Sequence, residues 1–202
     1  SAGTLFDPEV GKPDCVYSRS GCFIDQLPSV ATLPDLAVDA TRLEGLDPLF
    51  SLLIHAGKRA FDDGVNAPLD RSRVGVIVGN LALPTETSTL LTRNWLGRTF
   101  EEQLTGKASS PSATSPLNRY PTGLPAGILA QALGLGGGCC TIDAACASSL
   151  YAIKLAMDEL LSGSVDAMLA GGVSRPDPLF TQMGFSQLRA LSRRGICSPF
   201  DA

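Results

Sequence analysis

Residues 143–149 read Asp-Ala-Ala-Cys-Ala-Ser-Ser and place one thiol, Cys146, where a predicted strand stops and a predicted helix starts. The preceding run, residues 138–143, is short, apolar and rich in β-branched or thiol side chains, which is typical of a buried strand. At the first turn of a helix, unpaired backbone N–H groups and the positive end of the helix dipole favour thiolate over thiol. We therefore predict that Cys146 is a nucleophile, and the alternative is an ordinary buried cysteine.

The segment after Cys146 has the pattern of a helix that ends at Gly163, a residue type favoured just past a helix C-terminus. Its apolar residues mostly follow the spacing of one helical face: Leu150, Ile153, Leu155, Met157, Leu160 and Leu161. The residues that flank Cys146 are small, so a substrate carbonyl can approach and the chain can form the strained strand-to-helix turn called a nucleophile elbow. A second strand at 166–173 completes a strand–helix–strand unit with a right-handed crossover.

Composition excludes some classes of function and predicts covered surfaces. Charged residues make up 18% of the 202 residues, against roughly a quarter in average globular chains, and the mean hydropathy is positive. We expect some surfaces to be buried against the rest of a domain or against another subunit. The net charge is −4 and no long basic run is present, which argues against nucleic-acid binding. No apolar run reaches the roughly 20 residues of a membrane helix and no signal-like segment is present, so a cytoplasmic protein is expected.

The six cysteines form no C-x-x-C pair and have no histidine nearby, so we expect no metal site. Cys139 and Cys140 are neighbours on a strand and point to opposite faces, which disfavours a disulfide between them. Reduced thiols are therefore expected. The single histidine, His55, lies in a predicted helix and is interpreted as a surface or packing residue.

The rest of the chain reads as an α/β domain. A helix is predicted from Pro48 to about Asp63, with Asp47 as its cap and Leu49, Leu53, Ala56 and Ala60 along one face. The other predictions are loops and short turns over 1–46, a buried strand at 73–79, a helix at 85–104, a loop at 105–119 and a helix at 122–133, in which Gly127 allows close packing. The length predicts about one domain.

Four stretches of the chain resemble the β-ketoacyl synthases, or ketosynthases, of fatty acid and polyketide assembly. They read DAACASSL, LAGGV, MGFSQLRALS and CSPFDA, in the order and at the spacings of that family. These stretches are most similar in sequence to those of ketosynthase domains in large multidomain polyketide or polyunsaturated fatty acid synthases. The resemblance is strong over 121–202, fair over 46–83 and weak elsewhere. It implies a thiolase-like layered α/β fold of two similar halves, each with a mixed sheet covered by helices, of which residues 1–202 supply the N-terminal half.

The resemblance also implies an acyltransferase mechanism. Cys146 would take an acyl chain, as a thioester, from the phosphopantetheine arm of an acyl carrier protein or domain, and elongate it by decarboxylative Claisen condensation with a malonyl-type extender. Two histidines and a second oxyanion-hole amide would come from the C-terminal half, so the 202 residues alone are expected to be inactive. No directly bound cofactor is implied. A homodimer is expected, and in the family the 105–119 region lies near the dimer interface and the acyl pocket.

Two further site residues follow from the same resemblance. Phe185, in MGF, matches an aromatic residue that borders the acyl pocket, and Arg189, in RALS, matches a basic residue near its mouth. A guanidinium there can pair with the pantetheine phosphate or with an acidic carrier surface. Gly171 and Gly172 match glycines where the backbone approaches closely. The motif around the nucleophile reads ACASS, whereas ACSSS is commoner in the family. The change exchanges one small residue for another and leaves the cysteine in place.

Three alternatives remain open from the sequence. One is a thiolase-type condensing enzyme that uses coenzyme A thioesters. Another is a cysteine hydrolase, which is disfavoured because no histidine of this chain pairs with Cys146 by motif. The third is a non-catalytic scaffold or dimerisation half in which the cysteine has no chemical role.

Overall fold

The computed structural model describes residues 5–21, 24, 26, 29–64, 68–107, 110, 114–176 and 178–198. The chain divides into two compact units, one spanning Leu27–Arg175 and the other combining Ser1–Gln26 with Pro176–Ala202.

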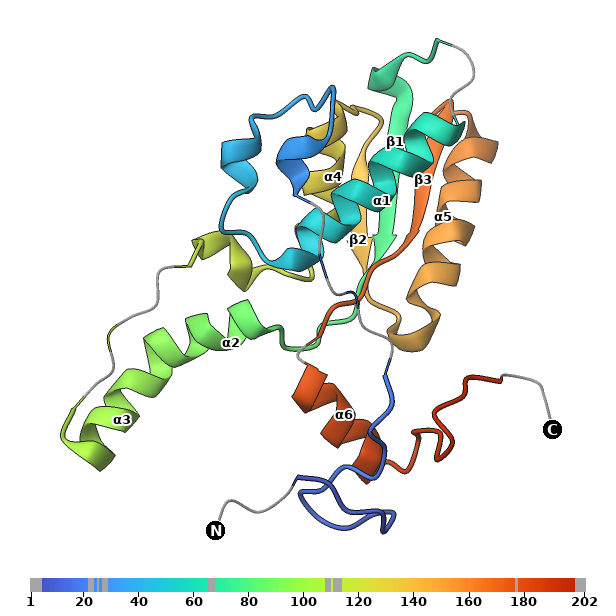
Figure 1. Ribbon diagram of the computed structural model, residues 1–202. Helices are drawn as coiled ribbons and strands as arrows, with labels where there is room; N and C mark the ends of the chain where they lie inside the picture. The colour runs from blue at the N-terminus through green and yellow to red at the C-terminus, as the bar shows by residue number, and fades with distance from the viewer. Residues whose placement is uncertain are drawn as a thin grey trace. The chain divides into compact units, whose positions relative to one another are not determined.

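The larger unit is organised around a parallel sheet of three strands in the order β2-β1-β3 (Figure 1). The strands are β1, Val74–Gly79; β2, Cys139–Ile142; and β3, Ala167–Gly172. β1 is central and completely buried, and it pairs in parallel with both neighbours. The predicted strands at 73–79, 138–143 and 166–173 are thus confirmed, as is the α/β class. All three described strands are parallel, so the antiparallel strand required for the expected mixed sheet is not among the described residues.

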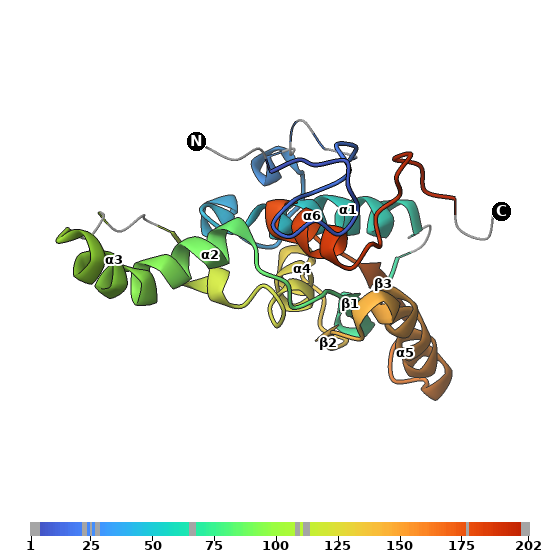
Figure 2. The same cartoon turned by 90° about the horizontal axis from the view of Figure 1, so that it is seen from below.

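Helices cover both faces of this sheet (Figures 1 and 2). Helices α1, Pro48–Gly64, and α4, Pro125–Leu133, pack on one face, where alternate residues of β1 from Val74 to Val78 join their apolar side chains in the main core. Helix α5, Ser148–Ser162, packs on the other face, where Ile77 meets Ala152 and Ala156. The alternation of side chains along a strand therefore divides β1 between two helical layers.

Helix α1 begins as predicted, because the Asp47 carboxylate accepts a hydrogen bond of 2.9 Å from the N–H of Leu49. Its predicted apolar face is only half right. Leu49 and Leu53 are buried, whereas Ala56 and Ala60 are exposed, and the helix turns Phe50, Ile54 and Phe61 into the core instead.

The remaining predicted elements are present with shifted bounds. The helix predicted at 85–104 consists of α2, Glu86–Thr92, a π-helical turn, Arg93–Gly97, and α3, Arg98–Thr105. The predicted helix 122–133 starts later, at Pro125, a residue suited to the first helical position. Within the predicted loop 105–119, residues 116–119 form a 3-10 turn, and residues 108–109 and 111–113 lie outside the described part. Short 3-10 turns also occur at Val30–Thr32, Ala40–Leu43 and Arg71–Arg73.

The apolar face predicted for the helix after Cys146 is not the face that packs on the sheet. Helix α5 ends at Gly163 as predicted, in the left-handed conformation with φ 74°. Its buried residues, however, are the small Ser148, Ala152 and Ala156. The large apolar residues of α5 are exposed, Leu150 by 70% and Leu161 by 82%. Small side chains let the helix lie close to the sheet, and the large ones face away from it.

The smaller unit contains helix α6, Pro178–Gln187, and the segment that precedes residue 22. The two parts are joined by hydrogen bonds: the Tyr17 hydroxyl donates to the carbonyl of Leu191 at 2.8 Å, and the Gln187 side-chain amide donates to the carbonyls of Lys12 and Cys15. Across both units, none of the helices in the described residues combines the length and apolar character required to cross a bilayer.

Candidate active site

Cys146 lies on a sharp turn between β2 and α5, as the sequence predicts. β2 ends at Ile142, a 3-10 turn covers Ala145–Ala147, and α5 starts at Ser148. Ala145, directly before the thiol, has φ 50°, a left-handed conformation that is costly for a residue with a Cβ. Cys146 itself is exposed. The structure therefore has a strained turn that presents a thiol at the start of a helix.

Two side chains hold the backbone of this turn. The Asp143 carboxylate accepts a hydrogen bond from the N–H of Ala145 and another from the N–H of Ala82, both 2.9 Å long. These two backbone donors lower the pKa of Asp143 below its ordinary value, the bond from Ala145 being the larger cause. The Ser148 hydroxyl accepts from the N–H of Ala144 at 2.9 Å and donates to the carbonyl of Ala145 at 2.6 Å.

Glycines at the ends of β1 and β3 allow the start of α5 to approach the sheet. A Cβ added at Gly79 would lie 2.6 Å from the carbonyl carbon of Ser148, and one added at Gly172 would lie 2.9 Å from the Cβ of Ser149. Gly172 thus has the predicted close approach. Gly171 does not, because a Cβ there would meet nothing within 4 Å.

Gly127, expected to allow close packing, would also keep only an ordinary contact of 3.9 Å, with the Sγ of Cys139. The close helix contact instead occurs at Gly57 of α1, where an added Cβ would lie 2.6 Å from the Leu129 side chain. Sequence reasoning missed Gly57, because an isolated glycine inside a helix pattern does not show which partner helix it meets.

Cys146 opens into a cavity of about 240 Å³. The lining comes from the ends of β1 and β3 and from the start of α5: Gly79, Leu81, Ala145, Cys146, Ser148, Ser149, Gly172, Val173 and Ser174. The carboxyl ends of parallel strands meet at one edge of a sheet, where ligands commonly bind. Leu81 and Ser174 were not predicted as lining residues, because their proximity to the thiol depends on the pairing of β1 with β3.

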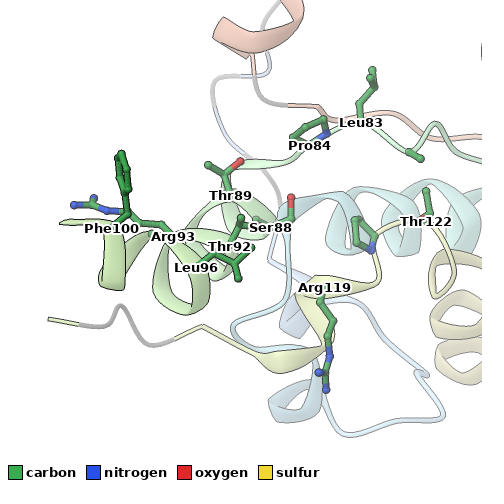
Figure 3. A pocket seen from close by; sticks show the side chains of 13 residues that line it. Leu83, Pro84, Ser88, Thr89, Thr92, Arg93, Leu96, Phe100, Arg119 and Thr122 are labelled. Carbon is green, nitrogen blue, oxygen red and sulfur yellow. The ribbon is translucent and has the colours of Figure 1, made fainter. Parts of the chain in front are cut away.

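A larger cavity of about 750 Å³ lies beside the α2–α3 segment (Figure 3). Its apolar lining includes Leu83, Pro84, Leu96 and Phe100, and hydroxyl groups come from Ser88, Thr89 and Thr92. Arg119, from the 3-10 turn, also lines it, and its guanidinium lies 5.4 Å from the ring centroid of Trp95. No sequence motif indicates this cavity, since its lining comes from three separate segments.

Phe185 and Arg189 both belong to the smaller unit. Phe185, on α6, is 38% exposed. The carbonyl of Phe185 accepts a hydrogen bond from the N–H of Ala190, and the carbonyl of Ser186 accepts one from the N–H of Arg189. This pair of bonds is the pattern of a Schellman cap at the end of a helix. Arg189 occupies the left-handed cap position with φ 56°, where glycine is usual, and its guanidinium lies against Gly11. The sequence indicated no cap there, because the position is not a glycine.

No metal site is found in the part of the chain that the structure describes: it has no group of three or more His, Cys, Asp and Glu residues able to hold an ion. His55 is half-buried on α1 and does not line the cavity at Cys146. The five cysteines in the described ranges, Cys15, Cys139, Cys140, Cys146 and Cys197, are all free thiols.

The family model described as "Beta-ketoacyl synthase, N-terminal domain" matches residues 2–202. The chain belongs to the β-ketoacyl synthase family. Its likeness to ketosynthase structures confirms the expected thiolase-like layered fold. A solved structure described as "PfaC Keto synthase-Chain length factor" is 33% identical to this ketosynthase chain, with a TM-score of 0.78, over 98% of this chain and 23% of that one.

Two sequence relatives of this ketosynthase chain are large synthases. The mycocerosic acid synthase-like polyketide synthase of Mycolicibacterium smegmatis is 31% identical over 99% of this chain and 9% of its own length. One subunit of the polyunsaturated fatty acid synthase of Thraustochytrium is 41% identical over 37% of this chain and 4% of its own length. The chain therefore spans less than a tenth of these relatives.

Proposed function

We propose that this chain is the nucleophile-bearing N-terminal half of a ketosynthase domain, in which Cys146 accepts an acyl chain as a thioester. The observation that carries the proposal is the exposed thiol on the strained β2–α5 turn, which opens into a cavity at the carboxyl edge of the sheet. Membership of the ketosynthase family and relatives named as polyketide and polyunsaturated fatty acid synthases support the class of substrate.

The proposed reaction has two covalent stages. In the first, the Cys146 thiolate attacks the carbonyl carbon of an acyl thioester on the phosphopantetheine arm of a carrier protein or domain, and the carrier thiol leaves. In the second, a malonyl-type extender on the carrier loses carbon dioxide, its carbanion attacks the Cys146 thioester, and Cys146 leaves as thiolate. The Cys146 N–H, in the first turn of the helical segment, is suited to stabilise the oxyanion of each tetrahedral intermediate. The phosphopantetheine belongs to the carrier, so this chain requires no cofactor of its own.

Phe185 and Arg189 are the proposed substrate contacts. The partly exposed ring of Phe185 is assigned to the border of the acyl pocket. Arg189 is exposed and makes no ion pair with a described residue, which leaves its guanidinium available for the pantetheine phosphate or for an acidic carrier surface.

The exposed apolar residues of α5 support the presence of a second half. Leu150, Met157 and Leu161 are at least half exposed on this helix, whereas contiguous apolar patches on a monomer are usually covered or functional. We assign this face to the C-terminal half of the domain, which would also supply two catalytic histidines.

The complete domain is proposed to form a homodimer in the cytoplasm, a reducing compartment that suits the free thiols of the described cysteines.

Condensation by the full-length protein tests this function. Acyl-loaded and malonyl-loaded carrier protein are supplied together, and the β-ketoacyl product on the carrier is measured by mass spectrometry. We expect Cys146→Ala to lower product formation at least a thousandfold, roughly the loss seen when a covalent nucleophile is removed. Cys197→Ala, which removes another exposed thiol, is the matched control and should retain the parent rate. Condensation by Cys146→Ala at the parent rate would contradict the proposal.

A further inference from the structure

Asp143 connects two segments that are far apart in the sequence but meet at the carboxyl edge of the sheet. It follows β2 directly, and one of its carboxylate oxygens accepts from the N–H of Ala145, inside the Cys146 turn. The other oxygen accepts from the N–H of Ala82, in the segment that follows β1. Each bond is 2.9 Å long, so the carboxylate ties the turn to the segment after the central strand of the sheet.

The bond to Ala145 acts at the residue whose conformation is strained. A left-handed residue with a Cβ persists only where its surroundings hold it. Here three polar groups next to the strained torsions are satisfied by side chains: the N–H groups of Ala144 and Ala145 and the carbonyl of Ala145. Because Cys146 is the next residue, the torsions of Ala145 set the direction of both its thiol and its N–H.

The Asp143 carboxylate has no other partner in the described part of the chain, where no lysine or arginine pairs with it. Its two backbone donors lower its pKa below a value at which the carboxyl is already ionised near neutral pH. Substitution of Asp143 therefore removes these two hydrogen bonds without breaking an ion pair.

We propose that Asp143 is a positioning residue that holds the Cys146 turn in the geometry required for acyl transfer, by binding the N–H groups of Ala145 and Ala82 together. This inference rests on the proposed role of Cys146 as the acyl acceptor. It predicts that substitution of Asp143 affects two reactions of the Cys146 thiol differently, slowing acyl transfer and leaving alkylation nearly unchanged. Acyl transfer requires the thiol and the Cys146 N–H to meet one carbonyl group together, whereas alkylation by a small electrophile requires only an accessible thiolate.

The test uses the full-length protein and two probes, an octanoyl-pantetheine thioester and iodoacetamide, with the adduct on Cys146 measured by peptide mass spectrometry. We expect Asp143→Ala to slow acylation about tenfold, the scale of a lost hydrogen bond to a charged group. Alkylation should stay within about twofold of the parent, since it requires only the accessible thiol. Asp143→Asn should fall between parent and Asp143→Ala, because an amide oxygen can replace only one of the two carboxylate acceptors.

The matched control is Asp70→Ala. Asp70 accepts from the backbone N–H two residues ahead at 2.9 Å, as Asp143 does, but it lies before β1, at the opposite edge of the sheet from the Cys146 turn. This variant should acylate at the parent rate.

Equal acylation rates in Asp143→Ala and the parent, or an equal loss of acylation and alkylation, would overturn the inference. If Asp143→Ala does not fold, Asp143→Asn is judged by the same two criteria. Absence of acylation in the parent would instead refute the proposed function.

Discussion

Gly79, the last residue of β1, lies against the first residue of α5, only two positions after Cys146. The backbone carbonyl of Ser148 occupies the space where a Cβ at position 79 would stand, with both the carbon and the oxygen within 2.7 Å. Backbone atoms cannot rotate away as the end of a flexible side chain can. The placement of the thiol therefore depends on the absence of a side chain at the end of the central strand.

Gly79→Ala is expected to lower the free energy of unfolding by about 1–3 kcal/mol, as overpacking of a core does, and to slow acylation of Cys146 by displacing the start of α5. Denaturant unfolding and thioester acylation measure the two effects. Gly171→Ala is the control in the neighbouring strand, because its Cβ would meet nothing within 4 Å. It should be neutral or stabilising by about 0.5 kcal/mol. Equal stability of the Gly79→Ala variant and the parent would show that the close approach is not required.

Single residues of the site were predictable where a local pattern marks them. The small residues around Cys146 predicted a strained elbow, and the left-handed conformation of Ala145 confirms the strain in this turn. The role of Asp143 was not predictable from local sequence, because Ala82, its second partner, lies 61 residues away in the chain. The pairing of β1 with β2 brings Asp143 and Ala82 together, and the sequence of neither segment indicates that pairing.

At the scale of elements, the start of α1 is joined to two later segments by a buried polar network. The Asp47 carboxylate caps α1 through the N–H of Leu49 and also accepts from the hydroxyl of Thr87 on α2. The N–H of Asp47 donates to the side-chain oxygen of Asn118 at 2.7 Å, and Asn118 donates to the carbonyl of Gly45. Asp47 and Asn118 are both fully buried, so their polar groups depend on one another for partners.

Asp47→Ala is expected to lower the free energy of unfolding by about 2–3 kcal/mol, since it removes a helix cap and leaves buried donors unpaired. Asp39→Ala is the control: Asp39 also caps a helical turn, but it is exposed and its carboxylate accepts from Thr41 two residues on. Its loss should be clearly smaller in the same denaturant titration. Equal losses in the two variants would show that Asp47 acts as a simple cap and that the buried network adds nothing.

Helix α5 shows which part of an element the sequence could not assign. Its existence and its end at Gly163 were predictable from spacing and from the cap residue. Its buried face was not, because the large apolar residues that dominate the pattern face away from the sheet. The small residues at 148, 152 and 156, four apart, mark the side that packs on the strands. Helix α5 carries two apolar patterns, one of small and one of large residues, and periodicity alone does not show which of them packs on the sheet.

At the scale of the whole molecule, the exposed face of α5 predicts a partner layer. In the full-length protein, Leu161→Ser is expected to lower the free energy of unfolding by at least about 2 kcal/mol, as truncation of a buried leucine does. Leu161→Met, which keeps the side chain apolar and similar in volume, should cost less than about 1.5 kcal/mol. A change within about 0.5 kcal/mol for Leu161→Ser, typical of a surface site, would show that nothing covers this end of the helix.

The layered fold and the family were predictable from the motifs between 121 and 202, which carry the resemblance that the family match confirms. The expected mixed sheet is not seen among the described strands, which are all parallel. The cavity beside α2 and α3 was not predictable, because it requires the placement of three segments, including a helix with a π-helical turn.

The most direct test of the central claim is to locate the acyl group after a single turnover. The full-length protein is exposed to acyl-loaded carrier protein without extender, digested, and mapped by mass spectrometry. We predict one acyl thioester, on the peptide that carries Cys146, and none in Cys146→Ala. An acyl group on another residue, or undiminished acylation of Cys146→Ala, would contradict the account.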